Sequence, residues 1–285
     1  MAESDKRSHV HLPRTVNELL QLTRSHTDAP IYAGGTDLLK GATKAQFVLP
    51  DELISIQEVE ELQRVSRTDR HLDIGAGATV SRILEIGANV IAPSLVDALN
   101  HVGPPGLHSL ATIGGNLCCR DHLFSLAPLL TIMDVRYEIR RMGHSRWVAA
   151  ARFRDAEGAP GLAPGEVLTR VRIPLDQWNV QLFRQFGTIY LRDTQPVVFC
   201  GLAKRTKGVL DDFRMAFSAH RPILYRNRDL EADLVGRKLP LARREVHAFL
   251  RGVQQGMHES GLELSAVQGH RAMALTRLFL SVFSE

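Results

Sequence analysis

The sequence is poor in cysteine, and its cysteines are not spaced as ligands of a cluster. Three cysteines among 285 residues, an odd number, argue against a disulfide framework and favour a reducing compartment. Cys118 and Cys119 are adjacent while Cys200 is remote, so the ligand spacings of zinc and iron-sulfur sites are missing. If iron-sulfur chemistry takes part in the function, we expect another chain to carry the cluster.

Long apolar runs and a strong charge of one sign are also missing. No apolar stretch approaches the ~18 to 20 residues of a membrane helix, and no apolar signal core stands near the N-terminus. We therefore expect a cytoplasmic protein without membrane contact. The formal net charge of +4 is small, and Lys and Arg alternate with Asp and Glu, so nucleic-acid binding has little support.

Composition and length indicate a folded protein with more than one compact unit. Hydrophobic residues make up 44% and charged residues 23%, which is ordinary for a globular chain. The length allows two or three units. Residues 1–9 are polar and predict a flexible tail. We expect a first subdomain over 10–60, a second over 61–176 and a C-terminal α+β domain over 177–285.

Local patterns predict the elements within these units. In the first two units, a capping box and apolar periodicity predict a helix that begins at 15 and helices that cover 80–88 and 94–101. Short apolar runs predict strands at 30–33, 47–49 and 53–56. Turn residues at 142–145 predict a β-hairpin. The third unit opens with strands at 197–204 and 212–219, and two helices close the chain. We interpret the apolar faces of these helices as core; they carry Val246, Phe249, Leu250, Val253 and Met257 in the first and Leu275, Leu278, Phe279 and Val282 in the second.

The two most informative stretches are glycine turns at 33–38 and 111–117. Paired glycines permit positive φ and close approach of the backbone to a ligand, and consecutive N–H groups form a concave anion site. Thr36 and Thr112 add hydroxyl groups, and the Asn116 side chain can donate and accept. A single glycine turn more often only connects two strands, but the occurrence of the same pattern twice favours a pyrophosphate site for a dinucleotide.

Three other features are interpreted as ordinary. Residues 74–80 imitate the start of a dinucleotide fingerprint, but Val80 replaces its third glycine and no βαβ crossover follows, so we expect no Rossmann site there. The loop histidines show no metal-ligand spacing and are interpreted as polar surface or hydrogen-bonding groups; they are His101, His108, His122 and His144. Cys118 and Cys119 are interpreted as small buried residues beside the second turn.

The two turns resemble the paired flavin loops in the medium subunits of molybdenum hydroxylases, a family that includes xanthine dehydrogenases and carbon monoxide dehydrogenases. Further similarity is found at 53–56, 74–76, 164–168 and 173–174 and in the C-terminal part, so the resemblance covers nearly the whole chain. It implies an α+β fold in which two α/β subdomains form a PCMH-type FAD-binding fold. A C-terminal three-stranded antiparallel sheet with helices would follow, as in carbon monoxide dehydrogenase flavoproteins.

The resemblance also implies a function. The chain would be an oxidoreductase component that passes electrons from a 2Fe-2S subunit through FAD to NAD or another acceptor. A 2Fe-2S small subunit and a molybdopterin large subunit would be its partners and would carry those cofactors, while the chain itself would hold no metal and no catalytic acid, base or nucleophile. The implied cofactor-binding residues are Ala33, Gly34, Gly35, Thr36, Asp37, Leu38, Ala111, Thr112, Gly114, Gly115, Asn116, Asp121, Ser125, Val167 and Leu168.

Several positions depart from the family pattern. Ser125 stands where the family usually carries a carboxylate, and Asp121 is the nearest one. Gln185 and Ile189 stand where cations are expected near the flavin ring, a loss that should lower the flavin's reduction potential. These departures favour a second hypothesis, a scaffold or maturation protein of the same fold with weak or no FAD binding. A free-standing flavin oxidase is a third, but it would need a longer substrate domain and a flavin tether.

Overall fold

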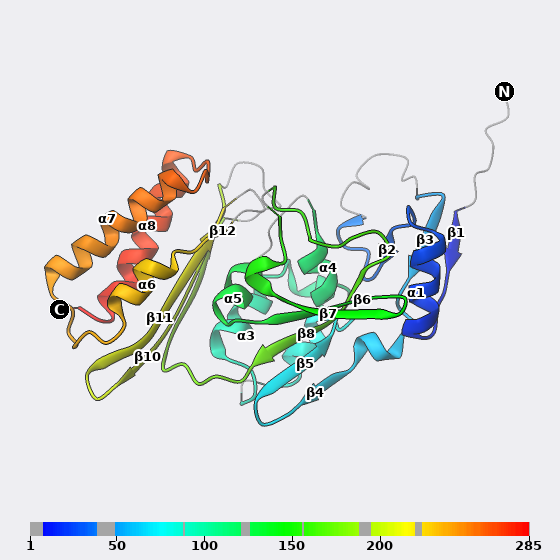
Figure 1. The fold of residues 1–285 in the computed structure, drawn as a ribbon, viewed down its shortest axis with the longest axis horizontal. Helices are drawn as coiled ribbons and strands as arrows, with labels where there is room; N and C mark the ends of the chain where they lie inside the picture. The colour runs from blue at the N-terminus through cyan, green and yellow to red at the C-terminus, as the bar shows by residue number, and fades with distance from the viewer. Residues whose placement is uncertain are drawn as a thin grey trace.

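The computed structural model of the chain describes residues 8–38, 49–87, 89–120, 126–155, 157–187, 195–219 and 224–284. These residues build three sheets with helices beside them, and the chain runs from one end of the molecule to the other (Figure 1). Of the expected tail, residues 1–7 lie outside the described residues, and His9 already belongs to a strand. No helix in the described part has the length and apolar character needed to cross a bilayer.

The first sheet is small and parallel, with strand order β1-β3-β2. Its elements are β1 (His9–His11), α1 (Val16–Ser25), β2 (Ile31–Tyr32) and β3 (Glu52–Ser55). Helix α1 begins where expected because the Thr15 hydroxyl accepts a hydrogen bond from the N–H of Glu18. The Glu18 carboxylate accepts from the N–H of Arg14 instead of Thr15, so the expected capping box is only half formed. The strand expected at 47–49 falls largely outside the described residues.

The second sheet has five strands in the order β4-β5-β8-β6-β7, all antiparallel. Its strands are β4 (Val65–Arg67), β5 (His71–Gly75), β6 (Arg136–Arg141), β7 (His144–Ala149) and β8 (Val167–Pro174). The expected hairpin is β6–β7, and Gly143 takes a positive φ in its turn. The helices of this unit are η2 (Glu60–Gln63), α2 (Val80–Leu84), α3 (Pro93–Asn100), η3 (Pro105–Leu107), α4 (Ile113–Cys118), α5 (Leu126–Ile132) and η4 (Ala150–Arg152).

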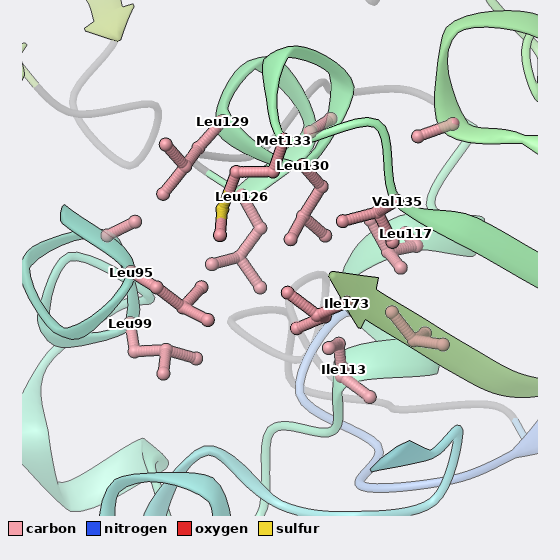
Figure 2. Packing of buried hydrophobic residues seen from close by; sticks show 14 of the residues in the cluster. Leu95, Leu99, Ile113, Leu117, Leu126, Leu129, Leu130, Met133, Val135 and Ile173 are labelled. Atoms are coloured by element: carbon pink, nitrogen blue, oxygen red, sulfur yellow. The ribbon is translucent and has the colours of Figure 1, made fainter. Parts of the chain in front are cut away.

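The largest core lies between this sheet and helices α3, α4 and α5. Figure 2 shows its side chains pointing toward one another from these elements, among them Leu95, Leu99, Ile113, Leu117, Leu126, Leu129, Leu130, Met133, Val135 and Ile173. Most of these side chains are almost completely buried. This close packing holds α4, and the second glycine turn at its start, in a fixed position against the second sheet.

The third sheet is antiparallel, in the order β12-β11-β10-β9. Its elements are β9 (Val180–Phe186), β10 (Val197–Thr206), β11 (Val209–Ser218), β12 (Leu224–Tyr225), α6 (Arg228–Leu234), α7 (Arg243–Glu259) and α8 (Ala266–Ser281). The sheet therefore has four strands, one more than the resemblance implies. The additional strand arises because Leu224 and Tyr225 pair with the end of β11.

Strand β10 is buried on both faces. Val198, Cys200 and Leu202 belong to the core of the second unit, while Val197 and Phe199 pack toward α7 and α8. The apolar faces of those helices are core as expected, with two exceptions. Leu278 and Val282 are 48% and 47% exposed, so they lie outside the buried face of α8. The buried face follows Ala272, Leu275, Thr276, Phe279 and Leu280 instead.

An ion pair connects β5 to β8 in the second sheet. Arg172 donates to Asp73 through two hydrogen bonds of 2.7 and 2.8 Å, and its guanidinium stacks over Trp147 at 4.3 Å. The hydrogen bond from Arg172 lowers the pKa of Asp73, against the opposing effect of burial.

This pair predicts an acid-dependent loss of stability. A depressed carboxyl pKa gives stability that is complete above the unfolded-state value of about 3.9 and is lost as pH falls through the lower folded-state value. Asp73→Asn should therefore destabilise the chain at pH 7 and flatten its stability profile below about pH 4. Urea unfolding at several pH values measures both effects, and an unchanged acid limb in Asp73→Asn would contradict the assignment.

Candidate functional site

The two glycine turns lie against each other although they are far apart in the sequence. A Cβ atom added at Gly34 would overlap the carbonyl oxygen of Leu110, so the first turn touches the second only because residue 34 is glycine. The Cys119 thiol also donates to Asp37 Oδ2, at 3.4 Å. Both turns line one cavity of about 250 Å³. The sequence-based expectation that the turns face a common site agrees with this arrangement.

The first turn offers free main-chain donors. Gly35 has φ +68°, the left-handed conformation expected of a glycine turn, and its missing side chain leaves room for the Tyr32 ring. Within the described part of the chain, the N–H groups of residues 34–36 have no hydrogen-bond acceptor. All residues from Ala33 to Leu38 line the 250 Å³ cavity. The turn can therefore bind an anionic group through its backbone.

The second turn differs from the expectation of a row of free N–H groups. It is the first turn of α4, and Thr112 is the N-cap residue, whose hydroxyl accepts from Gly115 N–H at 3.0 Å. Ile113 N–H donates to the Ala78 carbonyl at 3.0 Å, and Gly114 N–H donates to the Ala76 carbonyl at 2.8 Å. These N–H groups already donate to acceptors within the protein, so the second turn can bind a ligand only through its side chains.

Thr112 and Asn116 are the polar side chains that the second turn presents to the cavity. Both residues are only 7% exposed. Asn116 Oδ1 is buried and has no hydrogen-bond partner among the described residues. An unsatisfied buried polar atom costs about 1–3 kcal/mol, so we expect a ligand to supply the missing partner. Neither Gly114 nor Gly115 has a positive φ; Gly114 packs on Ala76 and lies outside the cavity lining.

A second cavity, of about 450 Å³, lies next to the first one. It shares Ala33, Gly34 and Thr112 with the first cavity and also includes polar residues of both units. These polar residues are Gln57, Gln63, Thr79, Arg82 and Ser109. The residues that the two cavities share belong to the two turns, so a ligand bound at the turns can extend into either cavity.

Arg154 supports α4 from behind the site. Its Nη2 donates to the carbonyls of Leu117 and Cys119, at 2.9 and 3.0 Å, where the helix ends. Burial lowers the pKa of Arg154, and the nearby Cys119, Cys118 and Tyr137 oppose this shift. Sequence analysis missed this residue because its partners lie far away in the chain and no motif marks it.

Loss of Arg154 should loosen α4. Because a hydrogen bond from a charged donor is worth about 1.5–3 kcal/mol, loss of the two bonds in Arg154→Met is expected to lower the free energy of unfolding by roughly 3–6 kcal/mol. Urea unfolding monitored by circular dichroism measures the change. The exposed neighbour Arg152 is the matched control, and equal effects of Arg152→Met and Arg154→Met would contradict the role.

The two cysteines behave as neutral lining residues. Burial raises the pKa of Cys118 to about 12, so its thiol stays protonated at neutral pH. Both cysteines line the first cavity beside the second turn; the surface of Cys119 is buried as interpreted, whereas that of Cys118 is only partly buried.

Two of the remaining residues of the predicted site lie outside the lining of both cavities. Val167 and Leu168, at the start of β8, are each 4% exposed, pack into two hydrophobic cores and line neither cavity. Gln185 also lines neither cavity, and its Oε1 atom is buried without a partner among the described residues. Asp121, Ser125 and Ile189 lie outside the described residues.

The fingerprint-like glycines at 74–80 have a structural explanation. A side chain at Gly75 would overlap the Leu62 carbonyl, and Gly77 N–H donates to that carbonyl at 2.8 Å. Strand β5 pairs antiparallel with its neighbours, so no βαβ unit is present around it. The absence of a Rossmann site, expected from the sequence, agrees with this topology.

The fold and the paired turns define a dinucleotide-binding protein outside the Rossmann class. Residues 6–176 match a family model described as FAD binding domain in molybdopterin dehydrogenase. The match covers more than half of the chain, so the chain belongs to this family. The resemblance drawn from the two turns is confirmed, and FAD is the cofactor of the family.

Individual relatives agree with the family assignment. Aldehyde oxidase 2 from Cavia porcellus is 29% identical over 221 residues, which are 72% of this chain and 16% of that protein. The nicotinate dehydrogenase FAD-subunit from Eubacterium barkeri is 30% identical over 169 residues, 56% of this chain and 56% of that protein. The matched region thus spans little more than half of the FAD-subunit and a small part of the aldehyde oxidase.

A solved structure shows the same fold. Carbon monoxide dehydrogenase from Hydrogenophaga pseudoflava, in a form that lacks the Mo-pyranopterin moiety of the molybdenum cofactor, contains a chain that matches with a TM-score of 0.80. The match covers 97% of this chain and 96% of that chain at 20% identity. The α+β fold expected from the sequence, including the C-terminal sheet with helices, is therefore confirmed.

Proposed function

We propose that this chain is the FAD-binding electron-transfer subunit of a molybdenum-hydroxylase type oxidoreductase. The observation that carries the proposal is the contact between the two glycine turns, which puts N–H groups of the first turn and Asn116 Oδ1 of the second, all without a hydrogen-bond partner among the described residues, into one cavity. The family assignment supports FAD as the ligand.

The residues present fit a flavin dinucleotide. In the proposed arrangement, the N–H groups of residues 34–36 and the Thr36 hydroxyl bind the diphosphate from one side. Thr112 and the Asn116 Nδ2 group donate from the other side, and the unpartnered Asn116 Oδ1 accepts from a hydroxyl group of the dinucleotide. Gly34 and Gly35 lack the side chains that would push the turns apart or displace Tyr32. FAD, when bound, supplies the ability to exchange electrons one or two at a time.

The protein's own contribution is position and electrostatics. We assign no catalytic acid, base or nucleophile to the chain, and the protonated thiol of Cys118 is in keeping with that assignment. Thr112 and Asn116 are each only 7% exposed, and a hydrogen bond to a charged group is stronger in such a buried setting than in water.

We further propose that the electron donor is a 2Fe-2S subunit and that a molybdopterin subunit oxidises the organic substrate in the cytoplasm. The relative named as the FAD-subunit of a nicotinate dehydrogenase supports a separate flavin subunit in such an assembly. NAD is one acceptor that the proposal allows. A scaffold protein with weak FAD binding is the alternative, favoured by Gln185 in place of a cation.

The test is the cofactor content of the purified chain. Flavin released by acid should be FAD, at about one equivalent per chain, and the bound form should absorb in the visible region. Reduction of this flavin by a co-purifying 2Fe-2S subunit would support electron transfer. A colourless chain that takes up no added FAD would overturn the proposal in favour of the scaffold.

A further inference from the structure

A cluster of histidines and one carboxylate lies on the first sheet, apart from both cavities. The ring centroids of His9 and His11 are 4.4 Å apart, and those of His11 and His26 are 4.3 Å apart. Glu52 completes the group because its Oε2 lies 2.9 Å from His26 Nδ1. None of the four residues lines either turn-associated cavity, so the cluster has no direct part in the proposed flavin site.

The fold brings these residues together from three separate elements. His9 and His11 are on β1, Glu52 is on β3, and the parallel pairing sets His9 opposite Glu52. His26 is the C-cap residue of α1, the helix that follows β1 in the chain. The sequence alone showed no metal-ligand spacing here, because the ligand positions meet only after β1 and β3 have paired.

The geometry is suited to a metal ion. The ligand atoms of His11, His26 and Glu52 lie within 4.8 Å of one another. His11 Nε2 is buried and has no hydrogen-bond partner among the described residues, a state that costs about 1–3 kcal/mol. Two imidazoles and one carboxylate are a ligand set that Zn²⁺ accepts, whereas Mg²⁺ and Ca²⁺ prefer oxygen ligands throughout.

We propose that His11, His26 and Glu52 bind one Zn²⁺ ion, with solvent or the neighbouring His9 in the remaining position. Tetrahedral zinc with bonds of about 2.0–2.1 Å places its ligand atoms roughly 3.4 Å apart. The side chains therefore need to close by no more than about 1.4 Å from their separations of up to 4.8 Å. The imidazole nitrogens that bind the ion carry no proton, so in the metal-bound state the ion stands between His26 and Glu52 in place of their 2.9 Å contact.

The proposed ion would be structural. Zinc has no redox chemistry, and these ligands tie β1, a strand of three residues at the edge of the sheet, to the end of α1 and to β3. The same small unit carries the first glycine turn directly after β2. The side chains of His26 and Glu52 are 30% and 43% exposed, so the ion can enter from solvent.

The test uses the full chain without a polyhistidine tag, stripped of metal by a chelator. Titration with Zn²⁺ in a calorimeter should show one saturable equivalent, with or without FAD. Co²⁺ should bind in competition with Zn²⁺ and give the visible absorption of a tetrahedral site with nitrogen and oxygen ligands. Absence of a saturable equivalent would overturn the proposal.

Variants locate the ion. His11→Gln and Glu52→Gln should each weaken Zn²⁺ binding by more than the roughly 10- to 100-fold that loss of an outer-shell partner costs. His144→Gln, at an exposed position of the β6–β7 hairpin, is the control and should bind as the wild type does. Wild-type affinity in His11→Gln would refute the site.

A measurement on the wild-type chain covers the case in which a variant fails to fold. Long-range ¹H–¹⁵N spectra of the histidine rings should show Zn²⁺-induced shifts for His11 and His26 and none for His144. Shifts confined to other histidines would overturn the assignment even if one equivalent of Zn²⁺ binds.

Discussion

Gly34→Ala is expected to weaken FAD binding by about 10- to 100-fold. The new methyl group would overlap the Leu110 carbonyl oxygen at the point where the two turns touch. Forcing extra volume into a packed contact costs about 1–3 kcal/mol, and each 1.4 kcal/mol corresponds to about tenfold in affinity. The turns must separate, and the free N–H groups of the first turn then no longer face Thr112 and Asn116 across one cavity. Fluorescence titration of the FAD-free variant with FAD measures the loss.

The control for this variant is Gly269→Ala in helix α8, where an added Cβ meets nothing within 4 Å. It should bind FAD as the wild type does. A second pair is matched in backbone conformation: Gly35 and Gly208 both have positive φ, +68° and +76°, but only Gly35 lines the cavity and packs against the Tyr32 ring. Gly35→Ala should lose FAD and Gly208→Ala should not. Wild-type affinity in both Gly34→Ala and Gly35→Ala would show that the contact between the turns does not position the cofactor.

The sequence predicts the location of the site better than its chemistry. Glycine pairs identify both turns because each pair permits a close backbone approach, and that approach is seen at Gly34 and at Gly35. The hydrogen bonds of the second turn could not be foreseen, since their acceptors are carbonyls of Ala76 and Ala78. Ala76 and Ala78 belong to the segment that resembles a dinucleotide fingerprint, and their carbonyl groups accept hydrogen bonds from the first N–H groups of α4.

Pattern-based predictions failed where long-range contacts decide. Leu278 and Val282 fit the helical period of α8 but lie on its exposed side, because the sheet covers only the stripe through Leu275 and Phe279. The zinc ligands proposed above were invisible for a related reason. The positions of His11, His26 and Glu52 along the chain follow no motif, and the three residues become neighbours only when β1 pairs with β3.

Asn116→Leu is expected to stabilise the FAD-free chain and to weaken FAD binding at the same time. Asn116 Oδ1 is buried without a partner among the described residues, and replacing an unsatisfied polar group by an apolar one of similar size removes a cost of about 1–3 kcal/mol. The midpoint of thermal unfolding without FAD should rise by about 2–4 °C for each kcal/mol gained. Affinity for FAD should fall by roughly 10- to 100-fold, because the hydrogen bond to the cofactor is lost.

Opposite signs of the two effects distinguish a binding residue from a structural one. Ser218 provides the comparison: its Oγ is also buried without a partner among the described residues, but it lies at the end of β11 and lines neither turn-associated cavity. Ser218→Ala should raise the unfolding midpoint of the FAD-free chain and leave FAD affinity unchanged.

If Asn116→Leu instead lowers the midpoint and keeps its affinity for FAD, the Asn116 amide stabilises the fold and the cofactor is held by the first turn alone. Calorimetric unfolding with and without a known excess of FAD yields both quantities from the same samples, because a ligand that binds only the folded chain stabilises it by RT ln(1 + [FAD]/Kd).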